Sequence, residues 1–345
     1  MSLQKFERFL LRWILRLPEG ILRRISGGTV RKRGRILDTK LQMALYLART
    51  KPRVESLAPK EAREFFKTSM LLFDLEPEEL FQVENFTIPV SKGRIGIRLY
   101  RPKQTLIPQP ALVYFHGGGF VIGDLDSHDP PLRYLSKKTG VLILSVDYRL
   151  GPEHKYPTAV EDAFVAYQWI LKNAKELGIL PKKIAVAGDS AGGNLAVNIS
   201  ILSKKKKLQL PFFQLLIYPY LDLLRMSASR NEFGRGYALT NKLLDYFNFH
   251  YLNDPLDAKE IAASPILQKE KAEFPKTYIQ LAGFDPLQDE GLELIESLKK
   301  TKIPVTYSLH ESLVHGYFNF AGVIPEAKRA LDELVLFIEE GFQIK

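Results

Sequence analysis

The chain has 345 residues, of which 46% are hydrophobic and 26% are charged. This composition is typical of folded globular proteins and excludes a disordered or collagen-like chain. There is no cysteine, which excludes disulfides, catalytic thiols and cysteine-ligated metal sites. Residues 1–35 hold ten basic and two acidic residues, and the rest of the chain holds 39 basic against 37 acidic, so +8 of the net charge of +10 lies at the N-terminus. The nearly neutral body argues against nucleic-acid binding outside that segment.

The first predicted element is an amphipathic helix over residues 6–17. Arg8, Arg12 and Arg16 interrupt its apolar run, so it is neither a signal-peptide core nor a membrane span. Its apolar stripe, at helical spacing, consists of Leu3, Phe6, Leu10, Trp13 and Leu17. We expect this stripe to pack on the protein body. The alternative is a helix that lies in the plane of a membrane.

Two segments, residues 1–80 and 222–262, do not follow the alternation of strands and helices found elsewhere. Both have helical patterns rich in Phe, Tyr and Leu. We expect them to form one helical cap, with 1–80 as its N-terminal part and lead-in and 222–262 as an insertion. The core then consists of residues 81–221 and 263–345.

The core pattern begins with a hairpin and continues with buried strands. Residues 83–90 and 94–100 alternate apolar and polar side chains around Ser91-Lys92-Gly93, as in a half-buried hairpin. Short continuous apolar runs then predict strands covered on both faces: 111–115, 141–146, 184–187, 213–217, 277–282 and 305–309. A helix is predicted over 157–177, capped by Gly178. The alternation predicts an α/β fold with a mostly parallel central sheet flanked by helices.

His116-Gly117-Gly118-Gly119 directly follows the first of these buried strands. Three consecutive glycines allow bare backbone N–H groups to converge on one small space, as an oxyanion hole requires. A phosphate cradle is the competing interpretation. The run matches neither G-x-x-x-x-G-K-[ST] nor G-x-G-x-x-G, so we favour the oxyanion hole.

Gly188-Asp189-Ser190-Ala191-Gly192 follows the strand predicted at 184–187 and precedes a helical pattern. A sharp turn from strand to helix exposes the serine hydroxyl at the helix N-terminus, and glycine on either side leaves room for the neighbouring backbone. The pattern G-x-S-x-G alone occurs by chance in about one chain of this length in ten. Together with the glycine loop, it predicts Ser190 as a nucleophile.

A serine nucleophile needs a base and an acid that orients the base. Of the six histidines, only His310 and His315 follow Ser190 outside the predicted cap. His315 is favoured because it lies in a loop beyond the last predicted strand, whereas His310 ends that strand. Asp285 lies just past the strand predicted at 277–282 and is the expected acid. Asp289 is the alternative acid. In that case Asp285 would be a turn or helix-capping residue. The order Ser, Asp, His is that of α/β-hydrolases.

Over about residues 80–345, the chain resembles the hormone-sensitive-lipase-like esterases. The blocks that carry the resemblance are 116–119, 147–150 with 152–154, 156–157 with 161–163, 188–193, 285–287 with 289–291, and 315–316. The resemblance implies an α/β-hydrolase fold with a helical cap. It implies Ser190 as nucleophile, His315 as base and Asp285 as orienting acid. The oxyanion hole it implies consists of the backbone amides of Gly118, Gly119 and Ala191.

These roles predict a serine carboxylesterase or lipase that hydrolyses apolar short- to medium-chain carboxylic esters through an acyl-enzyme. Such a reaction uses no cofactor and no metal ion, and its partner is a small-molecule ester. Alternatives are an amide or carbamate hydrolase, a membrane-recruited lipase, and a ligand-binding receptor on a hydrolase scaffold. Plant gibberellin receptors resemble the family but lack the catalytic histidine, so His315 argues against the last. We expect a cytoplasmic protein, with peripheral membrane contact through the basic N-terminal helix as the alternative; the sequence does not indicate an oligomeric state.

Overall fold

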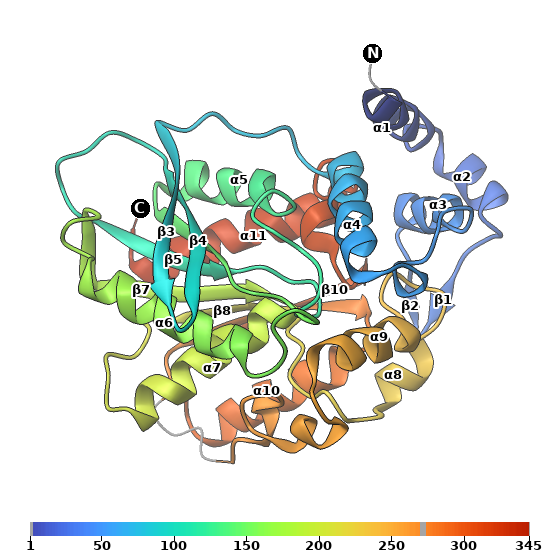
Figure 1. Cartoon of the computed structure of the whole chain (residues 1–345). Coiled ribbons are helices and arrows are strands. Elements are labelled where there is room, and N and C mark those ends of the chain that lie inside the picture. The colour runs from blue at the N-terminus through green and yellow to red at the C-terminus, as the bar shows by residue number, and fades with distance from the viewer. Residues whose placement is uncertain (1–2, 270–273, 345) are drawn as a thin grey trace.

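An eight-stranded mixed sheet forms the centre of the molecule in a computed structural model that describes residues 3–269 and 274–344 (Figure 1). The strand order is β10-β9-β8-β7-β5-β6-β4-β3. Its strands are β3 (Gln82–Val90), β4 (Gly93–Arg101), β5 (Gln109–Phe115), β6 (Leu142–Asp147), β7 (Ile179–Asp189), β8 (Gln214–Ile217), β9 (Thr277–Phe284) and β10 (Val305–Val314). The β3–β4 and β4–β6 pairs are antiparallel and the other pairs are parallel. The predicted hairpin and mostly parallel sheet are confirmed.

Helices cover both faces of this sheet, which explains the continuous apolar runs in its central strands. In Figure 1, α5 (Asp129–Thr139) and α11 (Pro325–Phe342) lie above the sheet, and α6 (Thr158–Lys172), α7 (Ala191–Lys205) and α10 (Gln288–Lys300) lie below it. Along β5, Ala111, Val113 and Phe115 belong to the core under α6 and α7, and Leu112 and Tyr114 belong to the core under α5 and α11. Alternate side chains of a strand point to opposite faces, so a strand that is buried on both faces lacks the alternation of polar and apolar residues.

The predicted helix over 157–177 is too long. The observed helix α6 ends at Lys172, and Gly178 does not cap it. The side chain of Asn173 donates to the backbone oxygen of Trp169 at 2.7 Å, as does the Asn173 backbone amide. Because these bonds satisfy a carbonyl of the last turn, the helix stops there.

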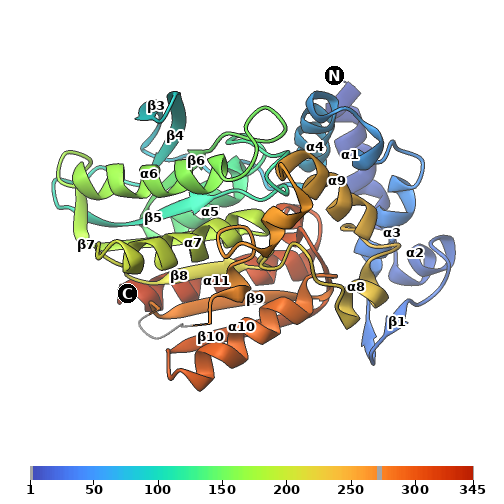
Figure 2. The same cartoon turned by 60° about the horizontal axis from the view of Figure 1, so that its bottom comes forward.

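The N-terminal helices form a cap, together with an insertion between β8 and β9. The N-terminal elements are α1 (Leu3–Ile14), α2 (Glu19–Ile25), the two-stranded β1 (Arg31–Lys32) and β2 (Arg35–Ile36), α3 (Thr39–Ala48) and α4 (Pro59–Phe73). The insertion contains α8 (Ala228–Phe233) and α9 (Asn241–Tyr251). Short 3-10 helices are η1 (Val54–Ser56), η2 (Pro255–Lys259), η3 (Pro265–Leu267) and η4 (Tyr317–Phe320). Figures 1 and 2 show the N-terminal helices and the helices α8 and α9 of the insertion on the same side of the molecule.

Specific contacts join the two parts of the cap across the sequence. The Tyr246 hydroxyl of α9 donates to the backbone oxygen of Leu57 at 3.1 Å. The Arg33 guanidinium lies 2.6 Å from the Glu232 carboxylate of α8. The cap is therefore one layer built from segments about 200 residues apart in the chain.

The prediction that the apolar stripe of the first helix packs on the body is wrong. Phe6, Leu10 and Trp13 are 48%, 42% and 56% exposed, and Leu17 is partly exposed; the Leu3 side chain lies outside the described residues. The opposite face of α1 makes the contact. There the packed side chains are Leu11, Leu15, Arg8 and Arg12.

The two arginines explain why α1 packs on this opposite face. Arg8 and Arg12 donate to the backbone oxygen of Asp74, at 2.9 and 3.0 Å, just past the end of α4. Carbonyl oxygens at a helix C-terminus lack partners within the helix and carry partial negative charge, which attracts cations. Both guanidinium groups also pair with Glu76. No helix among the residues that the structure describes is long and apolar enough to cross a bilayer.

Candidate active site

Ser190 occupies the sharp turn between β7 and α7. Its backbone has φ +53° and ψ −117°, outside the regions usual for a residue with a side chain. A Cβ atom at Gly192 would lie 1.8 Å from the backbone oxygen of Phe115, and one at Gly188 would lie 2.2 Å from Gly192. Both glycines are therefore required by close backbone approach. The turn holds the serine hydroxyl at the start of α7, as the G-x-S-x-G motif predicts.

His315 and Asp285 lie next to Ser190 although they are far from it in the sequence. Nε2 of His315 is 2.8 Å from Oγ of Ser190, and Nδ1 of His315 is 2.8 Å from Oδ2 of Asp285. The other carboxylate oxygen of Asp285 accepts a hydrogen bond from the backbone N–H of Leu287 at 2.8 Å. The three side chains follow β7, β9 and β10, whose carboxyl ends meet at one edge of the sheet. The structure thus brings together the three residues that the sequence singled out.

The two alternative residues lie elsewhere. His310 is part of β10, and its ring nitrogens lie 3.4 Å from Glu326 and 3.0 Å from Glu333, both on α11. Asp289 accepts a hydrogen bond from the backbone N–H of Ser229 at 2.7 Å, at the start of α8. Among the described residues, neither contacts Ser190 or His315.

The glycine loop forms a tight turn beneath the cap. Gly118 and Gly119 have φ values of +117° and +60°. The backbone oxygen of Gly118 accepts from the amides of Val121 and Ile122, at 3.1 and 3.0 Å. A Cβ atom at Gly119 would lie 2.2 Å from the Phe247 ring of α9. Among residues 3–269 and 274–344, the backbone amides of Gly118 and Gly119 have no acceptor, and Ala191 begins α7.

Asp189 ties the glycine loop to the serine turn, a contact that sequence analysis missed. Its buried carboxylate accepts from the backbone N–H of Gly117 at 2.7 Å and from the Tyr114 hydroxyl at 2.8 Å. Nε2 of His128 lies 3.3 Å from the same oxygen. The only sequence signal was the position of Asp189 inside the serine motif, which does not reveal a partner 72 residues earlier. Asp189 therefore fixes the position of the loop relative to Ser190.

Charge pairing stabilises this buried carboxylate. Burial alone would raise the pKa of Asp189, but His128, Tyr114 and Gly117 outweigh burial and hold that pKa below its usual value. Burial likewise opposes a charged His128, and Asp189 overcomes it to raise the pKa of His128. A second buried carboxyl, that of Asp74 just past the end of α4, has its pKa raised by burial to about 8, and the nearby His128 opposes this rise. Both shifts favour the charged forms of His128 and Asp189, which lie 3.3 Å apart.

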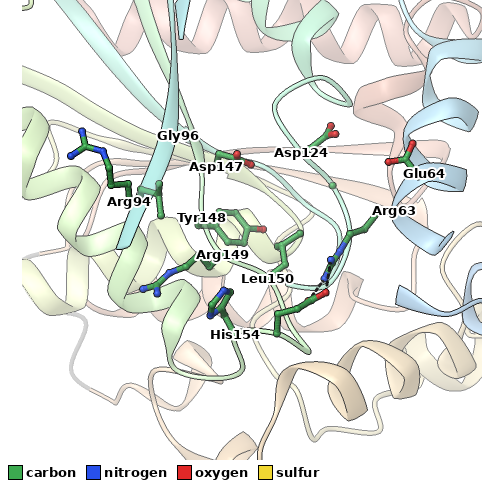
Figure 3. Close-up of a pocket in the computed structure, with 13 residues that line it drawn as sticks. Arg63, Glu64, Arg94, Gly96, Asp124, Asp147, Tyr148, Arg149, Leu150 and His154 are labelled. Carbon is green, nitrogen blue, oxygen red and sulfur yellow. Dashed lines mark hydrogen bonds and ion pairs between the residues drawn. The ribbon is translucent and has the colours of Figure 1, made fainter. Parts of the chain in front are cut away.

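A separate cavity of about 470 Å³ lies beside the site, between α4 and the core (Figure 3). Neither Ser190 nor His315 lines it. Its wall carries both signs of charge, including Arg63, Asp124, Asp147, Arg149 and His154. Arg63 crosses this junction and donates to the backbone oxygens of Val121 and Gly151, at 2.8 and 2.7 Å, and pairs with Glu153. No group of three or more His, Asp or Glu side chains in the described part of the chain has the arrangement of a metal site.

Comparisons with known proteins match this chain to one family. Residues 112–319 match the model of a family with the alpha/beta hydrolase fold. The chain is 39% identical over 249 residues to the carboxylic ester hydrolase LipN of Mycobacterium tuberculosis, covering 70% of this chain and 66% of that protein. It is 32% identical over 294 residues to the ethyl acetate hydrolase of Pseudomonas putida, covering 84% and 91%. An esterase structure from Pyrobaculum calidifontis superposes with a TM-score of 0.82 at 36% identity, covering 88% of this chain and 98% of that one.

Proposed function

Because this chain belongs to the hormone-sensitive-lipase-like family of α/β-hydrolases and is a carboxylic ester hydrolase, we propose that Ser190, His315 and Asp285 form its catalytic triad. The resemblance in the sequence and the predicted fold class are both confirmed by these matches. The observation that carries the proposal is the continuous chain of two 2.8 Å contacts from the Ser190 hydroxyl through the His315 ring to the Asp285 carboxylate. It is the geometry of a nucleophile, its base and the group that orients the base.

The proposed reaction starts at the serine hydroxyl. Asp285 accepts a hydrogen bond from the N–H at Nδ1 of His315, which leaves Nε2 unprotonated and able to remove the proton of Ser190 as its oxygen attacks the ester carbonyl. His315 then gives this proton to the departing alcohol, and the acyl group stays on Ser190. Water attacks the acyl-enzyme with the same base, releases the carboxylic acid and restores the serine.

The proposed oxyanion hole consists of the backbone amides of Gly118, Gly119 and Ala191. The amides of Gly118 and Gly119 point to no acceptor in the described structure, so they are available to a negatively charged oxygen. Ala191 adds the first N–H of α7, where the helix carries partial positive charge. Each such donor is commonly worth about 3 kcal/mol of transition-state stabilisation.

We propose apolar esters of short to medium chain as the substrates. The ring of Phe247 closes directly over Gly119, and Phe120 stacks on Tyr251 with ring centroids 4.1 Å apart. These aromatic side chains of the glycine loop and α9 favour an apolar acyl group of limited size. Relatives named ethyl acetate hydrolase and acetyl esterase act on small esters by their names, which supports the same range.

A panel of p-nitrophenyl esters from acetate to palmitate tests this proposal. We expect the highest kcat/KM between acetate and octanoate and a steep fall for palmitate. A maximum at palmitate, with a jump in rate above the solubility limit, would instead indicate a lipase that acts on aggregated lipid. p-Nitroanilides of the same acyl groups test the amide alternative, for which we expect no turnover because an amine leaves less readily than an alcohol.

We also propose the division of the chain into a core of residues 81–221 and 263–345 and a cap of residues 1–80 and 222–262. Phe247 of the insertion and Arg63 of α4 both contact the glycine loop region, which supports a cap that covers the core. The ester substrate then enters between the cap and the carboxyl ends of the strands.

A further inference from the structure

On the N-terminal helices, several large apolar side chains remain exposed in the part of the chain that the structure describes. Phe9 and Trp13 on α1 are 62% and 56% exposed, although the body of the protein lies against the other side of the helix. We call this surface the α1–α2 face; its exposed apolar side chains are Phe6, Phe9, Leu10 and Trp13 on α1 and Ile21 and Ile25 on α2. Single exposed apolar residues are ordinary, but a run of aromatic and aliphatic side chains along one helix face marks an interaction surface.

The charge around the α1–α2 face is positive and uncompensated. Arg16 and Arg24 are exposed, and in the described residues neither side chain has a carboxylate partner. The nearby acidic side chains are already paired: Glu7 with Lys51, Glu19 with Arg23, and Glu76 with Arg8 and Arg12. The net charge of +8 over residues 1–35 therefore leaves free positive charge beside the apolar side chains.

We propose that the α1–α2 face docks on an anionic lipid bilayer, with α1 lying in the plane of the interface. Helices of this kind bind membranes by inserting Trp, Phe and Leu at the boundary of the acyl chains while basic side chains contact anionic headgroups. Trp13 is suited to the boundary between headgroups and acyl chains because its ring is amphipathic. A second copy of the chain fits less well, because pairing two copies of this face would bring Arg16 and Arg24 near each other without a carboxylate to offset them.

Docking would bring the cap side of the molecule to the lipid. The α1–α2 face lies on the same side of the molecule as α4 and α9 in both views (Figures 1 and 2). Arg8 and Arg12 attach α1 to the end of α4, so the helix and the cap move as one body. Esters that partition into the bilayer would then reach the enzyme from the side that the cap covers. This consequence rests on the proposed function, whereas the docking itself does not.

Co-sedimentation of the full chain with vesicles tests the docking. The probes are vesicles of three parts phosphatidylcholine to one part phosphatidylglycerol, with pure phosphatidylcholine as the comparison. We expect binding to the mixed vesicles that weakens as salt rises, because screening shortens the range of the charges to about 10 Å at 0.1 M salt. Binding that is equal for both lipids and insensitive to salt would overturn the role of the basic residues.

Two pairs of variants separate the apolar and the charged contributions. The double variant Phe9→Ser and Trp13→Ser should lower the partition coefficient of the protein onto mixed vesicles by at least about tenfold. The double variant Arg16→Glu and Arg24→Glu should lower the same coefficient by about fivefold for each residue. The matched controls are Leu336→Ser, a 63% exposed leucine on α11, and Lys300→Glu, an exposed lysine on α10, which should bind like the parent chain. Equal losses in variants and controls would overturn the proposal.

Trp13 also reports its own environment. The chain has two tryptophans, and Trp169→Phe leaves Trp13 as the sole one. We expect its fluorescence to shift to shorter wavelength on mixed vesicles and to become protected from an aqueous quencher. An unchanged spectrum, or a dimer in sedimentation equilibrium that the Phe9 and Trp13 substitutions abolish, would show that the face serves a second copy instead.

Activity keeps this proposal separate from the proposed function. All face variants should hydrolyse soluble p-nitrophenyl butyrate at the parent rate, because none of these residues contacts the triad. Ser190→Ala should still bind mixed vesicles. Loss of hydrolysis with retained binding would therefore concern the triad alone, and loss of binding with retained hydrolysis would concern the face alone.

Discussion

The serine turn and the N-terminal helix are built in opposite ways. Around Ser190, polar side chains are buried, and Asp189 among them is held by Gly117, Tyr114 and His128. On α1, the aromatic side chains are exposed and the arginines make the contact with the body. A buried polar group is stable only when it is paired, whereas an exposed apolar side chain costs little in the isolated protein. The first region is stabilised by contacts within its own chain, whereas the exposed side chains of the second are proposed to contact a lipid bilayer.

The largest expected effect that distinguishes the two regions is that of Ser190→Ala. Because the hydroxyl is the proposed nucleophile and alanine fits the same turn, ester hydrolysis should fall at least about a thousandfold while the melting temperature stays near that of the parent. Initial rates on p-nitrophenyl butyrate and thermal unfolding measure the two quantities. A variant that keeps a tenth of the parent activity would remove Ser190 from the mechanism.

Asp285→Asn should also be severe, and Asp289→Asn is its control. Only Asp285 accepts a hydrogen bond from His315, so its replacement removes the group that fixes the ring tautomer and should lower kcat by about a thousandfold. Asp289 binds the start of α8, and its replacement should change kcat less than about tenfold. Equal losses in the two variants would reassign the acid.

On α1, we expect a contrast between its two faces in stability. Leu15 is 2% exposed and Leu11 lies beside it, so Leu15→Ala should lower the free energy of unfolding by about 2 kcal/mol. Trp13→Ser should change it by less than about 0.5 kcal/mol, because that ring is in solvent. Denaturant unfolding of both variants provides the measurement. A large cost for Trp13→Ser would mean that the aromatic face has a partner in this chain after all.

The smallest expected effect concerns pH and the buried Asp74. Burial raises the pKa of this carboxyl from 3.8 to about 8 in the folded state, so between these values the folded protein binds more protons than the unfolded one. The free energy of unfolding therefore falls as pH rises through this window. In Asp74→Asn this part of the slope is absent, so the stability of the variant relative to the parent should rise as pH increases from 5 to 8. Parallel slopes for the two proteins would show that Asp74 does not titrate in this range.

The proximity of Ser190, His315 and Asp285 was predictable because the chemistry of a serine nucleophile restricts the choice of partners. Few histidines and carboxylates follow strands after Ser190, and the ends of parallel strands meet at one edge, so placement along the chain implied proximity in space. The role of Asp189 was not predictable, because its partners Gly117 and His128 lie 72 and 61 residues earlier. The helical period of α1 identified an apolar face but not whether that face turns inward. The backbone carbonyl of Asp74 accounts for that orientation, and only the folded chain brings it to Arg8 and Arg12.

The contacts of Arg63 have a mechanical consequence for the cap. This one guanidinium holds the backbone of the loop after the glycines, the backbone at Gly151 and the carboxylate of Glu153. Lifting α4 away from the core would break all of these bonds at once and leave buried carbonyls without donors. The α4 side of the cap therefore behaves as a fixed wall and not as a hinged lid. We therefore expect the range of ester sizes to be changed by trimming side chains next to Ser190 and not by loosening a hinge at α4.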